Sequence, residues 1–564
     1  MNSLANRLAV RAAGRHGVTG FTSQPQPKSL GEAARGRQVI AGNLLFAGQL
    51  VELNGKSPWD VAPPSADFSA ALHGFAWLDD LAVIGTAEAQ RIAQDWTHDW
   101  IRRYGKRAGP GWMPWLVGRR QIRWITHAIA LMNGADGDQT RAMIDTMGRQ
   151  ARYVQRNWTR TRPGFARFEA LTGYVQSATA LTGMERHLPA ALSDLAEVLQ
   201  RDIDADGAVP SRNPEELLEI FALLTWTTEV MRDTGRKPDP ALDASIARIA
   251  PVLRSLRLAD GGLARFHGGG RGRPGLLDLA LRQSRLRPAM SDGQAMGYGR
   301  LQSGAVTIIA DCAPPQLGPG SGRAHASSLA IQMTSGRDPV LVSCGAGMRL
   351  GPEWRRAGRA TPSHSTLVLA GYSSARMARK GEALVEGPKS VTCHVQRAGG
   401  ATTLAMTHDG WRATHGLTHE RTLTLAEDGR LVRGEDGLSA LAGEDRQVFD
   451  RVLRHTDDAS LAFQLHFHLH PDVRPVLDMG GQAVSLTLKS GEVWVFRQML
   501  ADGDSAAELS ISPSVYLDSR HVTPRATKQI VLSGRVSGYG GAVHWSLACP
   551  VARVRRRHQA PMIL

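Results

Sequence analysis

The chain has 564 residues, of which 42% are hydrophobic and 21% are charged, a balance that is ordinary for a globular protein. Single hydrophobic cores stop growing at roughly 250 to 300 residues, so this length predicts two or more domains. The formal net charge of +15 favours anionic partners such as an acidic polysaccharide, although a basic surface can also serve solubility alone. No nucleic-acid recognition motif accompanies the charge, so no specific nucleic-acid partner is expected.

The cysteines and the N-terminal residues limit the cellular setting. The four cysteines, at positions 312, 344, 393 and 549, fit neither a disulfide framework nor a CxxC zinc motif. The first thirty residues lack the apolar run of roughly 7–15 residues that a secretory signal needs. No run of about 18 apolar residues is present, so no transmembrane segment is expected. The sequence by itself predicts a cytoplasmic protein and leaves its oligomeric state undefined.

The first half of the chain reads as helices. Residues 1–35 form a basic lead-in, and apolar residues recur at helical spacing from Asp67 onward,. Thr86 suits a helix start. Further helices are expected near 112–133, 137–158, 164–184, 187–203, 213–234, 238–258 and 276–285. Short loops between them predict an (α/α) toroid of helical hairpins over residues 36–295.

Tryptophans are concentrated in this helical half, which holds nine of the thirteen. Their faces could stack on sugar rings in a concave surface, or they could pack helix against helix, as large aromatic side chains usually do. Both interpretations stay open from the sequence alone.

From Gln302 the apolar period changes to two. Eleven short segments, from SGAVTIIADC to AVHWSLA, alternate in this way and are separated by Gly, Asp or Pro turns,. No helical crossovers are visible between them, so the strands are expected to be antiparallel. The prediction is an α+β multidomain protein in which an antiparallel β-sandwich spans residues 296–550, followed by a basic tail at 551–564.

Several motifs of the second half resemble one known family. The segments His325-Ala326-Ser327-Ser328, Leu341-Val342-Ser343-Cys344-Gly345 and Arg359-Ala360-Thr361-Pro362-Ser363-His364 are similar to those of the heparinase II/III-like family of polysaccharide lyases. The resemblance continues in Asp409-Gly410-Trp411 and His415-Gly416-Leu417-Thr418-His419. It implies a helical toroid with a β-sandwich, β-elimination on a uronate-containing polysaccharide such as a heparin-like glycan, and a location in the cell envelope or periplasm.

The resemblance also suggests a metal site. His325 and His364 match positions at which related lyases hold zinc together with an aspartate. Ser343 takes the place of that aspartate, and the neighbouring Cys344 would be the better zinc ligand. A structural zinc ion on His325, Cys344 and His364 is therefore one prediction, while the reaction itself requires no cofactor. Alternatively, the two histidines contact substrate or hold the strand ends together.

β-Elimination requires a group that neutralises the uronate carboxylate, a base for the C5 proton and an acid for the leaving oxygen. Related lyases carry a Ser-Pro-x-Tyr pattern with a catalytic tyrosine, where this chain has Glu216. They also carry an asparagine where this chain offers only Arg167. We therefore assign catalysis to His325, His364, Glu216 and Arg212, with Arg212 gripping the carboxylate. An alternative is that Arg212 is a surface residue beside a helix cap at Asn213.

Substrate binding is assigned to the remaining polar candidates. They are Arg167, Asn213, Arg359, Trp411, His415 and His419. His466, His468 and His470 alternate with apolar residues, which places all three on one strand face, expected to be solvated or to line a cleft.

Two functions follow from these residues. The first is a polysaccharide lyase acting on an acidic glycan. The second is a non-catalytic protein that binds acidic glycans or maintains the envelope and retains the lyase fold, which the replacement of the family's tyrosine by Glu216 favours.

Overall fold

The computed structural model describes residues 4–23, 25–287, 289–291, 293–456, 458–499, 507–518 and 521–550. The predicted basic tail at 551–564 lies outside them. The chain divides into two compact units. The helical unit comprises Met1–Pro210, Glu215–Arg254 and Gly272–Met290, and the β unit comprises Ser211–Pro214, Ser255–Arg271 and Ser291–Leu564. Residues 211–214 and 255–271, which were predicted in the helical domain, thus belong to the β unit.

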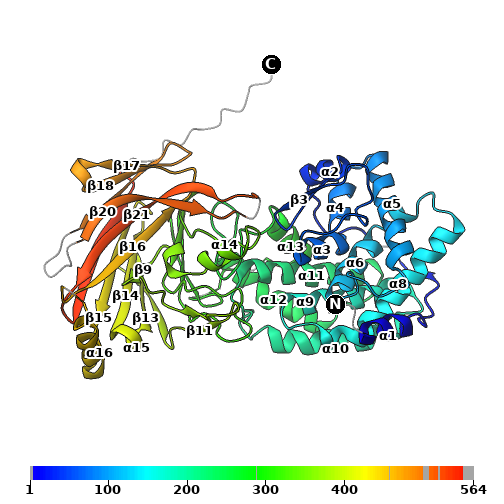
Figure 1. Cartoon of the computed structure of the whole chain (residues 1–564), viewed down its shortest axis with the longest axis horizontal. Helices are drawn as coiled ribbons and strands as arrows, with labels where there is room; N and C mark the ends of the chain where they lie inside the picture. Colours follow the sequence, from blue (N-terminus) through cyan, green and yellow to red (C-terminus); the bar gives the residue numbers. More distant parts are fainter. Residues whose placement is uncertain are drawn as a thin grey trace, which may run out of the picture. The chain divides into compact units, whose positions relative to one another are not determined.

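The helices from α3 to α13 lie close to the predicted ranges, whereas α1, α2, α14, α15 and α16 were not predicted (Figure 1). In chain order the helices are α1 (Leu4–Ala12), α2 (Ala33–Ile40), α3 (Ala66–His73), α4 (Trp77–Ala82), α5 (Ala87–Tyr104), α6 (Pro114–Thr126), α7 (Ala128–Met132), α8 (Gly137–Asn157), α9 (Phe165–Ala180), α10 (Leu188–Asp202), α11 (Pro214–Asp233), α12 (Pro240–Ser255), α13 (Leu276–Ser284), α14 (Pro352–Ala357), α15 (Arg412–His415) and α16 (Gly443–Leu453). Among the described residues, no helix combines the length and the apolar character that crossing a bilayer demands.

Local side-chain chemistry explains where the helices begin. The Thr86 hydroxyl accepts a hydrogen bond from the Ala89 N–H and caps α5, as predicted. Asp136 accepts from the Gln139 N–H, and the Gln139 side chain accepts from the Asp136 N–H, which forms a capping box at α8. Such caps satisfy backbone donors that have no partner inside the helix.

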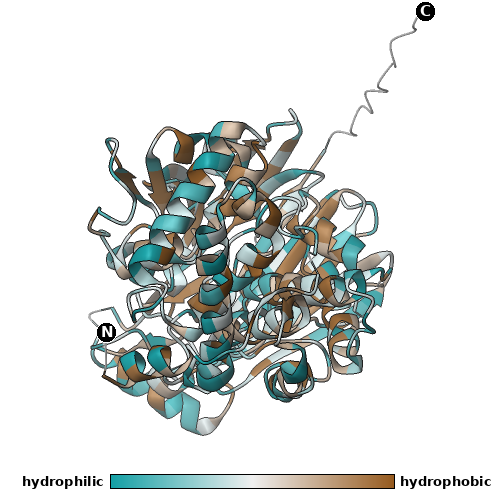
Figure 2. Ribbon diagram, turned by 90° about the vertical axis from the view of Figure 1, so that its right-hand side faces the viewer, coloured by the Kyte–Doolittle hydropathy of each residue, from teal (hydrophilic) through white to brown (hydrophobic). Residues whose placement is uncertain are grey.

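Glycines set the closest helix contact of the helical unit. Gly118 of α6 faces Gly173 of α9, and a Cβ at Gly173 would overlap the Gly118 backbone. A Cβ at Gly118 would likewise overlap the Glu169 carbonyl. Only glycine allows the backbones to approach this closely. The surrounding helices alternate hydrophilic and hydrophobic residues, as their colours show in Figure 2.

Most of the helical unit's large tryptophans are packing residues. Trp77, Trp100 and Trp124 are fully buried. The rings of Trp100 and Trp124 meet edge to face with centroids 5.5 Å apart, and the buried Arg120 guanidinium lies 4.0 Å from the Trp100 ring centroid. For these side chains the packing alternative is confirmed, because no ring face remains for a sugar.

The N-terminal lead-in is more structured than predicted. Residues 4–12 form α1, which contacts α8. Asn6 donates to the Trp112 carbonyl at 3.2 Å and accepts from the Tyr153 hydroxyl at 2.6 Å. The polar composition of this segment suggested a loose chain, but these distant partners hold it in place.

The β unit consists mainly of two large antiparallel sheets, as predicted. Its strands are β5 (Tyr298–Ser303), β6 (Val306–Asp311), β7 (Ile331–Ser335), β8 (Asp338–Val342), β9 (Leu367–Leu369), β10 (Arg376–Met377), β11 (Leu384–Glu386), β12 (Val391–Ala398), β13 (Ala401–Trp411), β14 (Leu417–Ala426), β15 (Leu431–Ser439), β16 (Leu461–Leu469), β17 (Arg474–Asp478), β18 (Ala483–Thr487), β19 (Val493–Met499), β20 (Ala507–Tyr516), β21 (Arg525–Val536) and β22 (Gly540–Ala548). Four short strands lie in the helical unit instead: β1 (Gly20–Phe21), β2 (Asn43–Phe46), β3 (Gln49–Glu52) and β4 (Leu181–Thr182).

One sheet has the order β12-β13-β14-β15-β22-β19-β18-β17, and the other has the order β20-β21-β16-β8-β7-β6-β5, with β9 beside β16. The late strand β22 therefore lies in the middle of its sheet, between β15 and β19.

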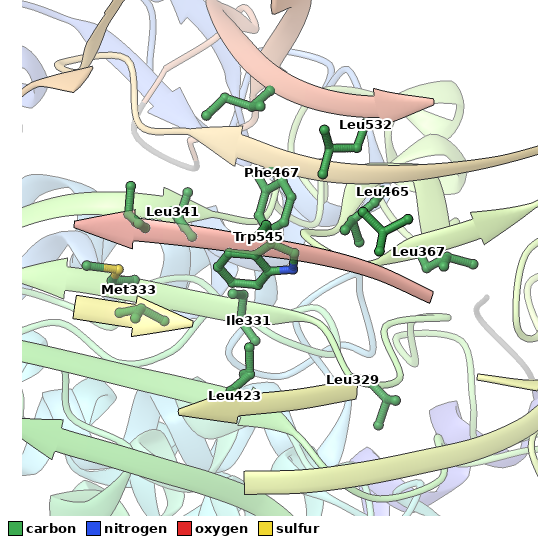
Figure 3. Packing of buried hydrophobic residues seen from close by; sticks show 14 of the residues in the cluster. Leu329, Ile331, Met333, Leu341, Leu367, Leu423, Leu465, Phe467, Leu532 and Trp545 are labelled. Carbon is green, nitrogen blue, oxygen red and sulfur yellow. The ribbon is translucent and has the colours of Figure 1, made fainter. Parts of the chain in front are cut away.

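Alternating apolar residues from both sheets form one core. Figure 3 shows Phe467 and Trp545 together with surrounding leucines between the strands. The Phe467 and Trp545 rings pack edge to face with centroids 4.8 Å apart, and both are fully buried. Gly434 on β15 leaves the space that the Trp545 ring occupies. This core fixes the strand ends at which the candidate residues lie.

Candidate functional site

Two histidines meet in the β unit, as the signature segments predicted. His325 precedes β7, and His364 follows a single 3-10 turn at Thr361–Ser363 that leads into β9. Their ring centroids are 5.2 Å apart. Both side chains are buried, with exposed fractions of 1% and 0%.

Backbone and hydroxyl groups hold one side of each imidazole. The Gly268 N–H donates to His325 Nε2 at 3.0 Å, and His364 Nδ1 lies 3.0 Å from Ser343 Oγ. His325 Nδ1 and His364 Nε2 have no hydrogen-bond partner among the described residues. Burial lowers the pKa of His325 well below its usual value and that of His364 to about 3. Both rings are therefore neutral near pH 7, and neither is poised to donate a proton as an acid.

The third predicted zinc ligand does not join the two histidines. Cys344 Sγ lies 3.5 Å from His468 Nδ1 and 3.8 Å from Ser514 Oγ, and burial raises the pKa of its thiol. Nowhere in the described part of the chain do three His, Cys, Asp or Glu side chains gather so that they could hold a metal ion. The two unpartnered nitrogens alone do not make a zinc site, which usually needs at least three protein ligands. Zinc binding therefore remains a prediction from the sequence.

Arg212 is not available to clamp a carboxylate. Its Nε donates to the Met296 carbonyl at 3.2 Å, and its two terminal nitrogens donate to the carbonyls of Gly297, Ala313 and Pro314 and to Asp311 Oδ1 at 2.5–3.1 Å. A guanidinium has five N–H donors, and these five acceptors use all of them. The Arg212 side chain therefore ties together segments of the β unit, and none of these donors is left over for the uronate carboxylate that was assigned to it from the sequence.

The partner of Arg212 belongs to a buried cluster that the sequence did not reveal. Asp311 accepts from the Ser327 hydroxyl at 2.6 Å and lies 3.3 Å from His267 Nε2. Burial would raise the pKa of Asp311, but the Arg212 charge and the His267 interaction outweigh it and hold the pKa below its usual range. His267 Nδ1 in turn accepts from the His325 N–H at 3.1 Å. The only signal in the sequence was an ionisable residue that ends the apolar strand Val306–Asp311.

Asn213 and Arg359 are also enclosed, with exposed fractions of 2% each. Arg359 donates to the carbonyls of Ala324 and Ser321 at 2.8 and 2.9 Å. These bonds position the loop that carries His325, and they leave Arg359 little surface for substrate.

The predicted sugar-stacking residue Trp411 lies in the sandwich core with 1% of its surface exposed, and its indole N–H donates to the Tyr372 carbonyl at 3.1 Å. The buried ring presents no free face on which a sugar could stack. His415 packs edge to face on Tyr372 with centroids 5.0 Å apart. His419 is fully buried and bridges His408 and a buried carboxylate at 3.2 and 2.9 Å.

His466 and His468 lie on β16 and His470 follows its end; the rings of His466 and His468 are parallel with centroids 5.9 Å apart, as expected for one strand face. That face is not solvated, however. The three side chains are 7%, 2% and 7% exposed, and His468 bonds the Pro362 carbonyl and Ser514 at 2.8 Å each. Neighbouring loops and β20 cover the strand.

Glu216 and Arg167 belong to the helical unit and are only partly buried. Arg167 donates twice to the Thr161 carbonyl, at 2.7 and 3.2 Å. The Glu216 carboxylate lies beside Gly164, the residue that precedes α9, because a Cβ there would come within 3.3 Å of Glu216 Oε1. A carboxylate is favourably placed near a helix N-terminus. These two candidates therefore share one end of α9.

The family described as heparinase II/III-like, C-terminal, matches residues 285–546. FtsZ-localized protein C of Caulobacter vibrioides (strain NA1000 / CB15N) is 30% identical over 555 residues, which cover 96% of this chain and 92% of that protein. The chain belongs to the heparinase II/III-like family.

Solved structures of heparinase enzymes share the fold. The crystal structure of heparinase III matches with a TM-score of 0.68 at 13% identity, covering 97% of this chain and 89% of that one. A mutant of heparan sulfate lyase HepC from Pedobacter heparinus matches with a TM-score of 0.60 at 15% identity, covering 96% and 87%. Identities this low show the heparinase-like fold alone.

Proposed function

We propose that this protein is a non-catalytic member of the heparinase II/III-like family that acts through binding at the site of cell division. The observation that carries the first half of this proposal is the complete use of the five Arg212 donors inside the β unit. Neutral, enclosed histidines at positions 325 and 364 support it. The chemistry of β-elimination needs a carboxylate clamp and an acid–base pair, and these buried groups supply neither.

The relative from Caulobacter vibrioides supports the second half. Its name states that it localises with FtsZ, and its 30% identity extends over 96% of this chain. A fluorescent fusion of the full chain tests this directly. We expect it to coincide with labelled FtsZ, and the same image distinguishes a cytoplasmic from an envelope location. A signal spread evenly through the cell would refute the division-site role.

Lyase activity on an acidic polysaccharide is the second candidate, and one observation favours it. Glu216 and Arg167 lie at the same end of α9 and are partly exposed, so they could serve as base and carboxylate ligand. The net charge of +15 would also concentrate an anionic chain near the protein.

Incubation with heparin or alginate separates the two candidates. β-Elimination leaves an unsaturated uronate that absorbs in the ultraviolet, whereas simple binding leaves the absorbance unchanged. We expect the polysaccharide to bind without forming an unsaturated product, and we expect Glu216→Gln to leave this binding unchanged. Product formation that Glu216→Gln abolishes and that Glu435→Gln leaves intact would establish the lyase and overturn the non-catalytic proposal.

A further inference from the structure

Two cysteines from different sheets of the β unit meet at the edge of the sandwich. Cys312 directly follows β6, which belongs to the β5-to-β20 sheet, and it is 2% exposed. Cys393 lies on β12, the edge strand of the other sheet, and is half-buried. Both side chains pack on the same hydrophobic core.

Both cysteines adjoin the side chain of Met406. Cys312 Sγ lies 3.4 Å from Met406 Sδ. Met406 on β13 is directly opposite Cys393 on β12, and directly opposite side chains have Cβ atoms about 4.5–5.5 Å apart. The Cys312 and Cys393 thiols are close enough to influence each other's titration. The pair therefore spans from one sheet to the other.

The two thiols differ in exposure. Cys312 is 2% exposed, whereas Cys393 is half-buried and lies on an edge strand. A disulfide reagent therefore reaches Cys393 first, and Cys312 is placed to resolve the product. The buried Cys344, by contrast, has a pKa raised by its burial.

We propose that Cys312 and Cys393 are a redox-sensitive modification site, at which a reversible disulfide joins the two sheets of the sandwich. The oxidant is a low-molecular-weight disulfide such as oxidised glutathione. The Cys393 thiolate attacks one of its sulfurs, which forms a mixed disulfide and releases one glutathione thiolate. Cys312 then loses its proton and attacks Cys393 Sγ, which releases the second glutathione. Two protein thiols are oxidised, and one glutathione disulfide is reduced to two thiols.

Thiol mapping of the unaltered full chain tests the proposal. The protein is equilibrated with oxidised or reduced glutathione, alkylated under denaturing conditions, digested and analysed by mass spectrometry. Oxidation is expected to yield a cross-linked peptide pair containing Cys312 and Cys393, while Cys344 and Cys549 remain alkylated. Reduced glutathione should restore four alkylated cysteines. Alkylation of both Cys312 and Cys393 after full oxidation would overturn the proposal, and so would a Cys393–glutathione adduct that leaves Cys312 free.

A matched pair of variants gives a second measurement. In the wild-type protein, oxidation should raise the melting temperature of the β unit, because the disulfide restrains its unfolded state. Cys393→Ser is expected to abolish this rise, and Cys344→Ser to retain it. An equal rise in both variants would assign the effect to another residue. If Cys393→Ser does not fold, the cross-link map of the wild-type chain still decides the question.

Discussion

Asp436→Asn is the most informative test of how the sandwich is held together. The Asp436 carboxylate is 2% exposed and accepts from Arg421 Nε at 2.6 Å, from the Trp545 indole at 2.9 Å and from His419 Nε2 at 2.9 Å. Removing its charge leaves the fully buried Arg421 guanidinium without a counter-ion. Breaking a buried pair in this way costs about 3–5 kcal/mol.

The pKa of Asp436 gives a separate and smaller figure for the charge interaction alone. Burial would raise it, but the Arg421 charge and the His419 bond outweigh burial and lower it from 3.8 to about 2. Such a shift corresponds to about 2 kcal/mol of stability. Because the folded-state pKa is depressed, this stability is present above pH ~4 and is lost as the pH falls toward 2. The wild-type protein should lose it over that range, and Asp436→Asn should not.

Urea denaturation of the full chain measures the effect, and Glu435→Gln is the matched control. Glu435 is the preceding residue on β15, but its side chain is exposed. The unfolding midpoint of Asp436→Asn should fall by about 1 M or more, while the control should change by less than about 0.5 kcal/mol. The two units can unfold separately, so only one transition is expected to move. Equal midpoints for the two variants would refute the account of a buried ion pair.

Three further changes test other parts of the structure. Arg212→Lys retains the charge but offers only three donors. Thermal denaturation should therefore show that the free energy of unfolding falls by about 2–4 kcal/mol, while binding to heparin is unchanged. Weaker heparin binding at unchanged stability would contradict the structural role of Arg212. His364 has a pKa of about 3 in the folded protein, so only the unfolded state takes up a proton on this ring as the pH falls from ~6.5. The free energy of unfolding should therefore fall by about 1.4 kcal/mol per pH unit below pH ~6.5. His364→Asn should be less acid-sensitive in urea titrations, and a pH profile identical to that of the wild type would contradict the buried neutral ring. Gly173→Ala should destabilise by about 1–3 kcal/mol through overlap with Gly118,, whereas Gly137→Ala, which meets no atom within 4 Å, should be neutral in the same melt.

Local patterns in the sequence were sufficient for most helices between residues 66 and 284 and for eleven strands, but they missed α1 and strands such as β12, β15 and β20. The predicted range 137–158 corresponds to α8 at Gly137–Asn157, and Thr86 caps α5 as expected. Both depend on residues within a few positions of each other, so periodicity and capping chemistry reveal them. The meeting of His325 and His364 was also predicted, since family resemblance carries information about distant contacts that periodicity lacks.

The environment of each candidate side chain could not be predicted in the same way. Arg212 resembled a surface residue because its acceptors are carbonyls 84 to 102 positions away. Trp411 resembled an exposed platform, yet the Tyr372 carbonyl and the sandwich core enclose it. Asp311 and His267 were missed for the same reason, since neither has a partner close in sequence. Burial of a polar group depends on the completed packing.

The position of β22 has a consequence for biosynthesis. This strand pairs with β15 on one side and β19 on the other, so residues 540–548 join two parts of a sheet made earlier. Until residues 540–548 have left the ribosome, β15 and β19 each have an unpaired edge, and unpaired strand edges promote aggregation. A nonsense codon shortly before Gly540 would make that vulnerable state permanent. The sheet of the nascent chain is therefore complete only once β22 has been synthesised.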